Sequence, residues 1–234
     1  MKLRLIAVCA VMALTGCASV PRQPFNKEAN THVRKIAIVS VNSPEEYSVA
    51  MVNHPGNSFG LIGALVAAAD VNSMSTEFTR LQGETRNQIG PDLENAITKA
   101  LSEEGTFEVV QVAPGSMGKP RTAFLNDYPP AECDAYLDVV IQQAGYLAQF
   151  ASTPYLPTLS VPVRLVDAKS KTVLYTTTFF MTDGDVPSGG KQLVPDSRYG
   201  FKNFDELKAA LGRSDEGLKK GVSKLAQHVA ADLK

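Results

Sequence analysis

Apolar and polar residues recur with different periods along this chain, and these periods predict its elements. Residues 35–41 are almost continuously apolar and β-branched, which is typical of a central strand buried on both faces. Gly90 and Pro91 then start a helix, because proline suits the first helical turn, and Gly105 follows it as a cap. Residues 107–112 form a second predicted strand. A strand–helix–strand unit of this kind predicts parallel pairing through a right-handed crossover.

The middle of the chain has the patterns of an antiparallel sheet. Residues 134–145, 159–166 and 173–182 predict three strands, and a polar turn joins the last two into a hairpin. The second segment alternates regularly, so one face is expected to pack and the other to be partly wet. Pro162 lies inside this segment, and proline has no N–H to donate to a ladder. We therefore expect an edge strand or a bulge at that position.

Two helices close the chain. Asn203 and Glu206 form a capping box at the start of the first helix, and Gly212 is expected to end it. The second helix is predicted to begin at Ser214 or Asp215. It carries an apolar stripe that should pack on the sheet, made of Leu218, Val222, Leu225, Val229 and Leu233.

These elements predict one α/β (α+β) domain over residues 35–234. We expect a mixed β-sheet of about five strands with helices packed mainly on one side. Residues 42–88 interrupt the simple pattern and are expected to form an insertion. An apolar fraction of 44% is sufficient for a packed core, and no internal repeat is visible.

The first apolar run of the chain is not expected to be an element of the folded domain. Residues 5–14 follow Lys2 and Arg4, and the run is too short to span a bilayer, as in a secretory signal. It ends in Leu14-Thr15-Gly16-Cys17, which resembles the bacterial lipobox. The resemblance implies that residues 1–16 are removed and that Cys17 carries acyl chains, which anchor stably when there are two or more. An ordinary signal peptide with an incidental cysteine is the alternative.

The residues after Cys17 suggest where the mature protein lies. Position 18 is Ala rather than Asp, which in Gram-negative lipoproteins favours the outer membrane, with the domain facing the periplasm. No second apolar run approaches twenty residues, so the lipid is expected to be the only constitutive anchor. Residues 17–34 are predicted to be a flexible tether, which keeps the domain within roughly 23 Å of the membrane.

Charge and cysteine content exclude other classes of protein. The formal net charge is −1, and losing Lys2 and Arg4 with the signal makes it more negative. Because no basic stripe is present, nucleic acid is not expected as a partner. Cys9 is removed with the signal, and Cys17 is expected to be lipidated, so Cys133 would be the one cysteine left with a free thiol. Cys133 is expected to be a small buried filler or to form an intermolecular disulfide.

Residues 56–60 match the G-x-S-x-G pattern of α/β-hydrolases, in which Ser58 would be the nucleophile. A hydrolase triad needs a histidine later in the chain, and only His228 qualifies, but its helical position is expected to face solvent. His54 comes before the serine, which is the wrong order for this class. Ser58 is therefore the catalytic residue only in an alternative interpretation, and no other catalytic residue is assigned.

The same stretch carries a face of small residues at three- and four-residue spacings. Its members are Gly56, Gly60, Gly63, Ala64 and Ala67. Small residues let helices approach closely, as in membrane GxxxG pairs. A helix over this apolar stretch is about 16 Å long, which is too short to cross a bilayer. We expect it to be internal to the domain, to lie on the membrane, or to contact a second copy or a partner protein.

No metal site or cofactor is predicted. His32, His54 and His228 are scattered, and a single mature thiol cannot build a zinc cluster. Asp183 and Asp185 are expected to lie in a solvated turn at the start of a long loop, residues 183–200. The chain has neither a P-loop nor a dinucleotide-binding fingerprint.

The order of elements resembles the periplasmic α/β domain of the curli-secretion lipoprotein family and of the N-terminal domain of TolB. The resemblance rests on residues 35–41, 91–112, 134–138 and 163–175 together with the closing helix. It implies the same type of mixed sheet. The insertion at 42–88 departs from that pattern, and the chain lacks the membrane-crossing hairpins of a curli-type pore. No site residue of the family transfers to this chain.

These observations predict a non-enzymatic, lipid-anchored envelope protein whose periplasmic domain binds itself or another envelope protein. A serine hydrolase using Ser58 is one alternative. A small module that binds a lipid or a glycan beneath the hairpin is another.

Overall fold

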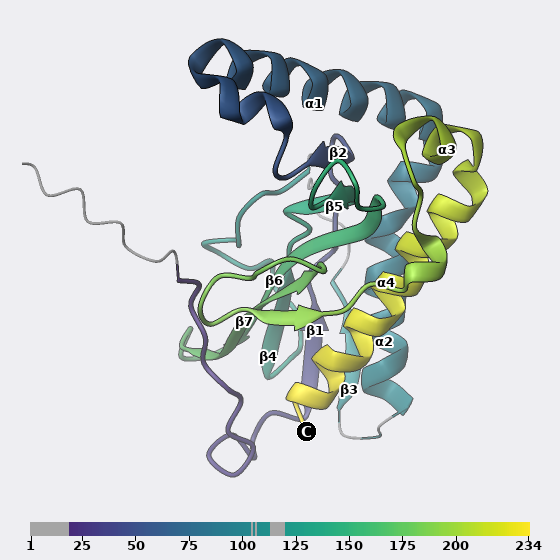
Figure 1. Cartoon of the computed structure of the whole chain (residues 1–234). Coiled ribbons are helices and arrows are strands. Elements are labelled where there is room, and N and C mark those ends of the chain that lie inside the picture. The colour runs from purple at the N-terminus through teal and green to yellow at the C-terminus, as the bar shows by residue number, and fades with distance from the viewer. Residues whose placement is uncertain (1–18, 104, 106, 113–119) are drawn as a thin grey trace, which may run out of the picture.

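The computed structural model describes residues 19–234 except 104, 106 and 113–119 (Figure 1). The lipobox and Cys17 lie outside these residues. The strands are β1 (Lys35–Ile38), β2 (Ser48–Met51), β3 (Glu108–Gln111), β4 (Ala135–Val139), β5 (Gln143–Ala148), β6 (Leu156–Asp167), β7 (Val173–Met181) and β8 (Lys191–Leu193). The α-helices are α1 (Gly60–Gln82), α2 (Ile89–Glu103), α3 (Phe204–Ala209) and α4 (Leu211–Asp232). Short 3-10 turns are η1 (Pro55–Phe59), η2 (Gly83–Gln88) and η3 (Ser197–Tyr199).

All eight of these strands belong to one mixed sheet with the order β2-β5-β6-β4-β1-β3, and β7 and β8 continue from β6. The parallel pair β1–β3 and the antiparallel hairpin β6–β7 are those that the sequence predicts. The α/β class is therefore confirmed, but the sheet has eight strands and not about five. One additional strand arises because β4 and β5 pair with successive parts of the same edge of β6, so one predicted strand is broken into two. The other two are the short strands β2 and β8, which the sequence pattern does not predict.

The break between β4 and β5 is a bulge opposite Pro162. Val139 pairs with Val163 and Gln143 pairs with Ser160, so one strand has one residue more than its partner between these pairs. Pro162 itself pairs with Thr178 of β7 on its other side. The expected bulge is present, and β6 is an interior strand rather than an edge.

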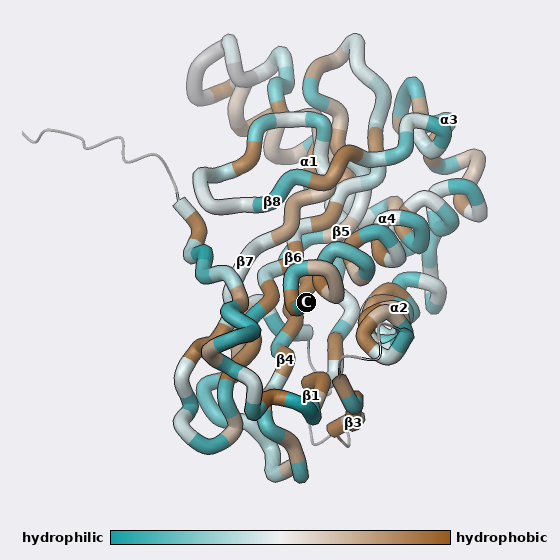
Figure 2. Tube along the Cα trace, turned by 90° about the horizontal axis from the view of Figure 1, so that it is seen from below, coloured by the Kyte–Doolittle hydropathy of each residue, from teal (hydrophilic) through white to brown (hydrophobic). Residues whose placement is uncertain are grey.

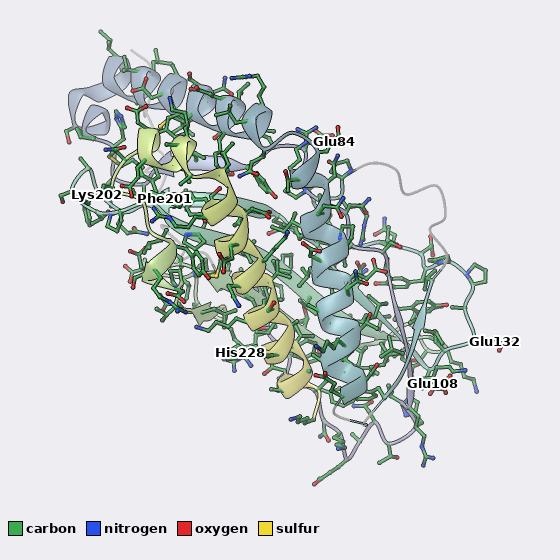
Figure 3. The ribbon with its side chains drawn as sticks, turned by 90° about the vertical axis from the view of Figure 1, so that its right-hand side faces the viewer. Glu84, Glu108, Glu132, Phe201, Lys202 and His228 are labelled. Atoms are coloured by element: carbon green, nitrogen blue, oxygen red, sulfur yellow. The ribbon has the colours of Figure 1, made fainter. Side chains whose placement is uncertain are left out.

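Two helices, α2 and α4, pack side by side over one face of the sheet (Figures 1 and 3). The stripe predicted for the last helix is buried against this face. Strand β1 is buried on both faces, as predicted, since Ile36 and Ile38 enter the main core while Ala37 and Val39 enter a second cluster. Figure 2 shows apolar positions gathered along β1 and β3.

The closing helices begin and end differently from the sequence prediction. Asn203 caps α3, and its side chain accepts from the Glu206 N–H at 2.9 Å, which is one half of the predicted capping box. The Glu206 side chain accepts from the Lys202 N–H at 3.0 Å rather than from the Asn203 N–H. The last helix starts at Leu211 and contains Gly212, so this glycine does not end a helix. Ala210, with φ −128°, is the break between the two helices.

Residues 19–34 are docked on the domain, which corrects the expected flexible tether for this part of the chain. Gln23 exchanges two backbone hydrogen bonds with Thr176 of β7, at 2.8 and 3.0 Å, and the Val20 N–H donates to the Ser188 carbonyl at 2.9 Å. Gln23 thus pairs with the part of β7 that β8 does not cover, and Val20 bonds to the loop between β7 and β8. The segment descends past β7 in Figure 1.

The docked segment ends in a hydrogen bond between His32 and Asp167. His32 Nε2 lies 2.7 Å from Asp167 Oδ2. The backbone N–H of Ser170, aided by His32, lowers the pKa of Asp167 to about 2, so this carboxylate stays charged. Charge on Asp167 therefore holds both the β6–β7 turn and the end of the N-terminal segment.

The expected insertion, residues 42–88, is part of the domain. It supplies β2, which pairs in parallel with β5 and forms an edge of the sheet, and it supplies α1. Figure 1 shows α1 crossing this end of the sheet and extending beyond it. Among the residues that the structure describes, no helix combines the length and apolar character needed to cross a membrane.

Candidate interaction site at helix α1

The C-terminal half of α1 docks on the edge strand β2 through two hydroxyl groups. Thr79 Oγ1 accepts from the Tyr47 N–H at 2.9 Å, and Ser75 Oγ accepts from the Val49 N–H at 3.0 Å. Both hydroxyls lie on one helical face because the residues are four apart. They satisfy edge donors that would otherwise invite another strand. Phe78, fully buried between Tyr47 and Tyr146, fixes the helix from the apolar side.

The row of docking hydroxyls ends at Ser75. One turn before it, the same face of the helix carries Val71. Valine has no hydroxyl, so nothing on α1 continues the row toward Met51, the next outward residue of β2. A groove of about 530 Å³ opens there between strand and helix. It is lined by Glu46, Met51, Val52, His54, Ala64, Ala67, Ala68, Val71, Asn72 and Ser75.

The outer face of α1 in its first three turns is apolar and exposed. Ile62, Leu65 and Val66 are 79%, 64% and 52% exposed, and their spacing places them on one stripe of the helix. Ala69 follows on this stripe, and the positions after it are polar, namely Ser73, Thr76, Glu77 and Arg80. The outer face of α1 is therefore apolar in its first half and polar in its second half. The first half projects beyond the sheet and exposes its apolar side.

The surrounding chain is uncharged. Between Tyr47 and Ala69 there is no Asp, Glu, Lys or Arg, and His54 is the only titratable imidazole. Val52 and Phe150, at 48% and 53% exposed, add to the apolar surface at this end of the sheet. Asn53 connects their segments by donating its backbone N–H to the Gln149 carbonyl at 3.0 Å. Exposed apolar clusters of this kind mark interaction sites on soluble domains.

The five residues predicted for contact all lie in η1 or the first two turns of α1. Ala64 and Ala67 line the groove, whereas Gly56 lies in η1, and Gly60 and Gly63 lie at the start of α1. The spacing of the small residues predicts a close contact but does not reveal the edge strand β2 or the exposure of the stripe. The stripe was visible in the spacing of Ile62, Leu65 and Val66, but only the structure shows which side of the helix faces the sheet.

Ser58 lies exposed in η1, in the turn between β2 and α1. No hydrogen bond joins it to a histidine within the described residues. His54 instead accepts the Gly56 N–H on Nδ1 at 3.0 Å, and its Nε2 lies 3.5 Å from Asp70 Oδ2. His228 is exposed in the C-terminal half of α4, away from α1 (Figure 3). A nucleophile at Ser58 stays a prediction without an assembled triad.

The remaining candidate residues form no metal centre in the described part of the chain, where no group of three or more His, Cys, Asp or Glu could hold an ion. Asp183 accepts from Gln149 Nε2 at 3.2 Å, and the predicted loop 183–200 contains β8 and η3. Cys133 is half-buried beside Tyr136 in the second cluster, and burial raises the pKa of its thiol.

No protein-family model matches the chain, and no curated protein matches it. The PelC dodecamer from Paraburkholderia phytofirmans is 13% identical with a TM-score of 0.38, over 91% of this chain and 94% of that chain. The protein XCC0632 from Xanthomonas campestris is 11% identical with a TM-score of 0.40, over 86% of this chain and 85% of that chain. The lipoprotein GNA1162 from Neisseria meningitidis is 12% identical with a TM-score of 0.30, over 65% of this chain and 87% of that chain. These similarities are too low to transfer a function, and the resemblance to curli-secretion lipoproteins and TolB stays a prediction.

Proposed function

We propose that this chain is a lipid-anchored, periplasm-facing protein of the bacterial outer membrane that acts as a non-enzymatic assembly module. Cys17 carries the anchor, and the projecting half of α1 makes the contact with a second copy or with another envelope protein. The exposed stripe of Ile62, Leu65 and Val66 is the observation that carries this proposal. The lipobox sequence supports the anchor.

The stripe favours a protein contact on energetic grounds. Large apolar side chains on a helix normally face the core, and covering one completely is worth about 1.5–3 kcal/mol. Three such side chains lie together here on one exposed face. The groove beside them adds the outward edge of β2 at Met51, where another extended segment would find backbone groups to pair with.

Leu65→Lys tests the contact. Two differently tagged copies are expressed together, the membranes are solubilised, and the second copy and other envelope proteins are quantified after capture of the first. A buried Lys in an apolar interface is expected to reduce capture by about tenfold or more. Because Leu65 is exposed, the thermal stability of the domain should stay close to that of wild type.

Ser73→Lys is the matched control. Ser73 is exposed on the same stripe, two turns after Val66, and should tolerate the charge without loss of capture. The contact at α1 would be refuted if the wild-type chain captured neither a second copy nor an envelope protein. Equal losses in the two variants would refute it as well.

A further inference from the structure

The face of the sheet opposite α4 carries a second hollow, separate from α1. It has a volume of about 430 Å³ and lies over β5, β6 and β7, between the end of β2 and the loop after β7. Its floor includes Gln143, Ser160 and Phe180, which are paired across three adjacent strands. Since neighbouring strands lie about 4.8 Å apart, this row spans roughly 10 Å.

Polar groups on the floor are open to a ligand. Ser160 is only 8% exposed but lines the hollow, and neither its hydroxyl nor the Gln143 amide has a hydrogen-bond partner among the described residues. A glutamine amide both donates and accepts, and so does a serine hydroxyl. Phe180 adds an aromatic ring. One edge of the ring packs against Gly190, which has room for it only because a glycine has no Cβ, since a Cβ there would lie 2.7 Å from the ring.

The walls of the hollow are held in place. Gln192 Nε2 donates to the carbonyl oxygens of Thr182 and Gly184, at 3.1 and 3.0 Å. Gln149 Nε2 donates to Asp183 Oδ1 at 3.2 Å from the other side. These bonds tie the loop after β7 to β8 and to the end of β5. The hollow is therefore preformed, as small-molecule sites usually are.

The residues that line the hollow limit the chemical class of ligand that it can bind. Asp185 is the one charged residue among the described residues of the lining, so no cation is present to attract an acidic ligand. Amides and hydroxyls on the floor disfavour an acyl chain, which needs an apolar lining. A sugar ring has an apolar face that stacks on an aromatic side chain, and hydroxyls that both donate and accept.

From this arrangement we infer that the hollow over β5–β7 is a binding site for an uncharged glycan, stacked on Phe180 and hydrogen-bonded by Gln143 and Ser160. Val52 lines both this hollow and the groove beside α1, but none of Ile62, Leu65 and Val66 lines the hollow, so the inference does not depend on the contact proposed there. N-acetylated and purely hydroxylated sugars offer the same chemistry to these groups, and the ligands used in the test distinguish them.

The test titrates the purified full-length chain, kept in a detergent without a sugar headgroup, with chitotetraose, cellotetraose and tetragalacturonate. Binding is followed by saturation-transfer NMR and calorimetry. We expect saturable binding of at least one neutral tetrasaccharide and none of the anionic one. Chitotetraose alone would indicate an N-acetylated glycan, and cellotetraose alone a hydroxylated one. Failure of both neutral ligands, or tighter binding of tetragalacturonate, would overturn the inference.

Adjacent glutamines supply a matched pair of variants. Gln143→Ala removes a group on the floor and should weaken binding about fivefold. Gln142→Ala should leave binding unchanged, because Gln142 instead donates to the Thr122 carbonyl outside the hollow, at 3.2 Å. Phe180→Leu keeps an apolar group without the ring and should also weaken binding about fivefold. Equal affinity in the Gln143 and Gln142 variants would overturn the inference whatever the fate of the Phe180 variant.

Discussion

Asp138 shows how a single residue can have a role that the sequence pattern conceals. Alternation along residues 134–145 places its side chain opposite Leu137 and Val139, on the face expected to be partly wet. In the structure it is fully buried beneath residues 120–134. Arg121 Nη1 and the Leu125 N–H donate to it at 2.9 Å, and the Tyr128 hydroxyl donates at 3.1 Å.

Asp138 also neutralises a second cation. Arg164 lies 3.7 Å from the same carboxylate and stacks over the Phe124 ring at 4.5 Å. Burial, together with the charge of Asp138, raises the pKa of Tyr128, so its hydroxyl remains a donor. One buried carboxylate therefore connects β4, β6 and the covering loop.

Asp138→Asn should destabilise the domain by about 3 kcal/mol, because two guanidinium groups would lose their buried counter-charge. Urea unfolding measures this directly. Asp127→Asn, in the same loop but exposed, should stay within about 0.5 kcal/mol of wild type. Equal midpoints for the Asp138 variant and wild type would show that the cluster does not hold the loop.

At the scale of elements, periodicity predicts those whose burial follows a simple rule. The stripe of α4 is buried on one face, as predicted. Strand β6 is different: it is buried on both faces, because residues 120–134 cover part of the face that its alternation predicts to be partly wet. The short strand β2 and the docked residues 19–34 have no such signal, because edge backbone groups and the hydroxyls of Ser75 and Thr79 hold them in place. The sequence predicts an apolar helix near residues 53–69, but α1 continues to Gln82, and the part docked on β2 is this later half, around Ser75 and Thr79.

Helix α4 approaches the sheet closely because it carries glycine where the two meet. A Cβ at Gly217 would lie 2.6 Å from Tyr146 Oη and 2.8 Å from Tyr199 Cβ. Tyr146 cannot retreat, because it is fully buried and donates to the Ser214 carbonyl at 2.7 Å. Gly212, one turn earlier, has open space around it.

The two glycines should therefore respond in opposite directions to the same substitution. Gly217→Ala is expected to destabilise the domain by about 1–3 kcal/mol through overpacking. Gly212→Ala should be neutral or stabilising by up to about 1 kcal/mol, since alanine favours a helix. The melting temperatures of the two variants, compared with that of wild type, test this prediction. A stabilising Gly217→Ala would contradict the close packing of α4.

For the whole molecule, the docked N-terminal segment would set how a lipid-anchored domain is held. Ser19, two residues after Cys17, pairs with Ser188, so the anchor proposed at Cys17 would be attached close to the folded domain. In Figure 1 the start of this segment and the first turns of α1 lie toward the same side of the molecule. An anchored domain of this kind would have restricted orientations, with the projecting helix near the membrane surface and able to meet neighbouring envelope proteins.

Photo-crosslinking in living cells tests this account most directly. A benzophenone amino acid replaces Leu65 in the full chain, and Arg80, exposed on the polar half of the same stripe, is the control position. We predict that the protein is recovered in the membrane fraction and that position 65 gives discrete crosslinks to a second copy or to an envelope protein, while position 80 does not. Recovery of uncrosslinked monomer from position 65, or equal crosslinking from both positions, would contradict the proposed role of α1.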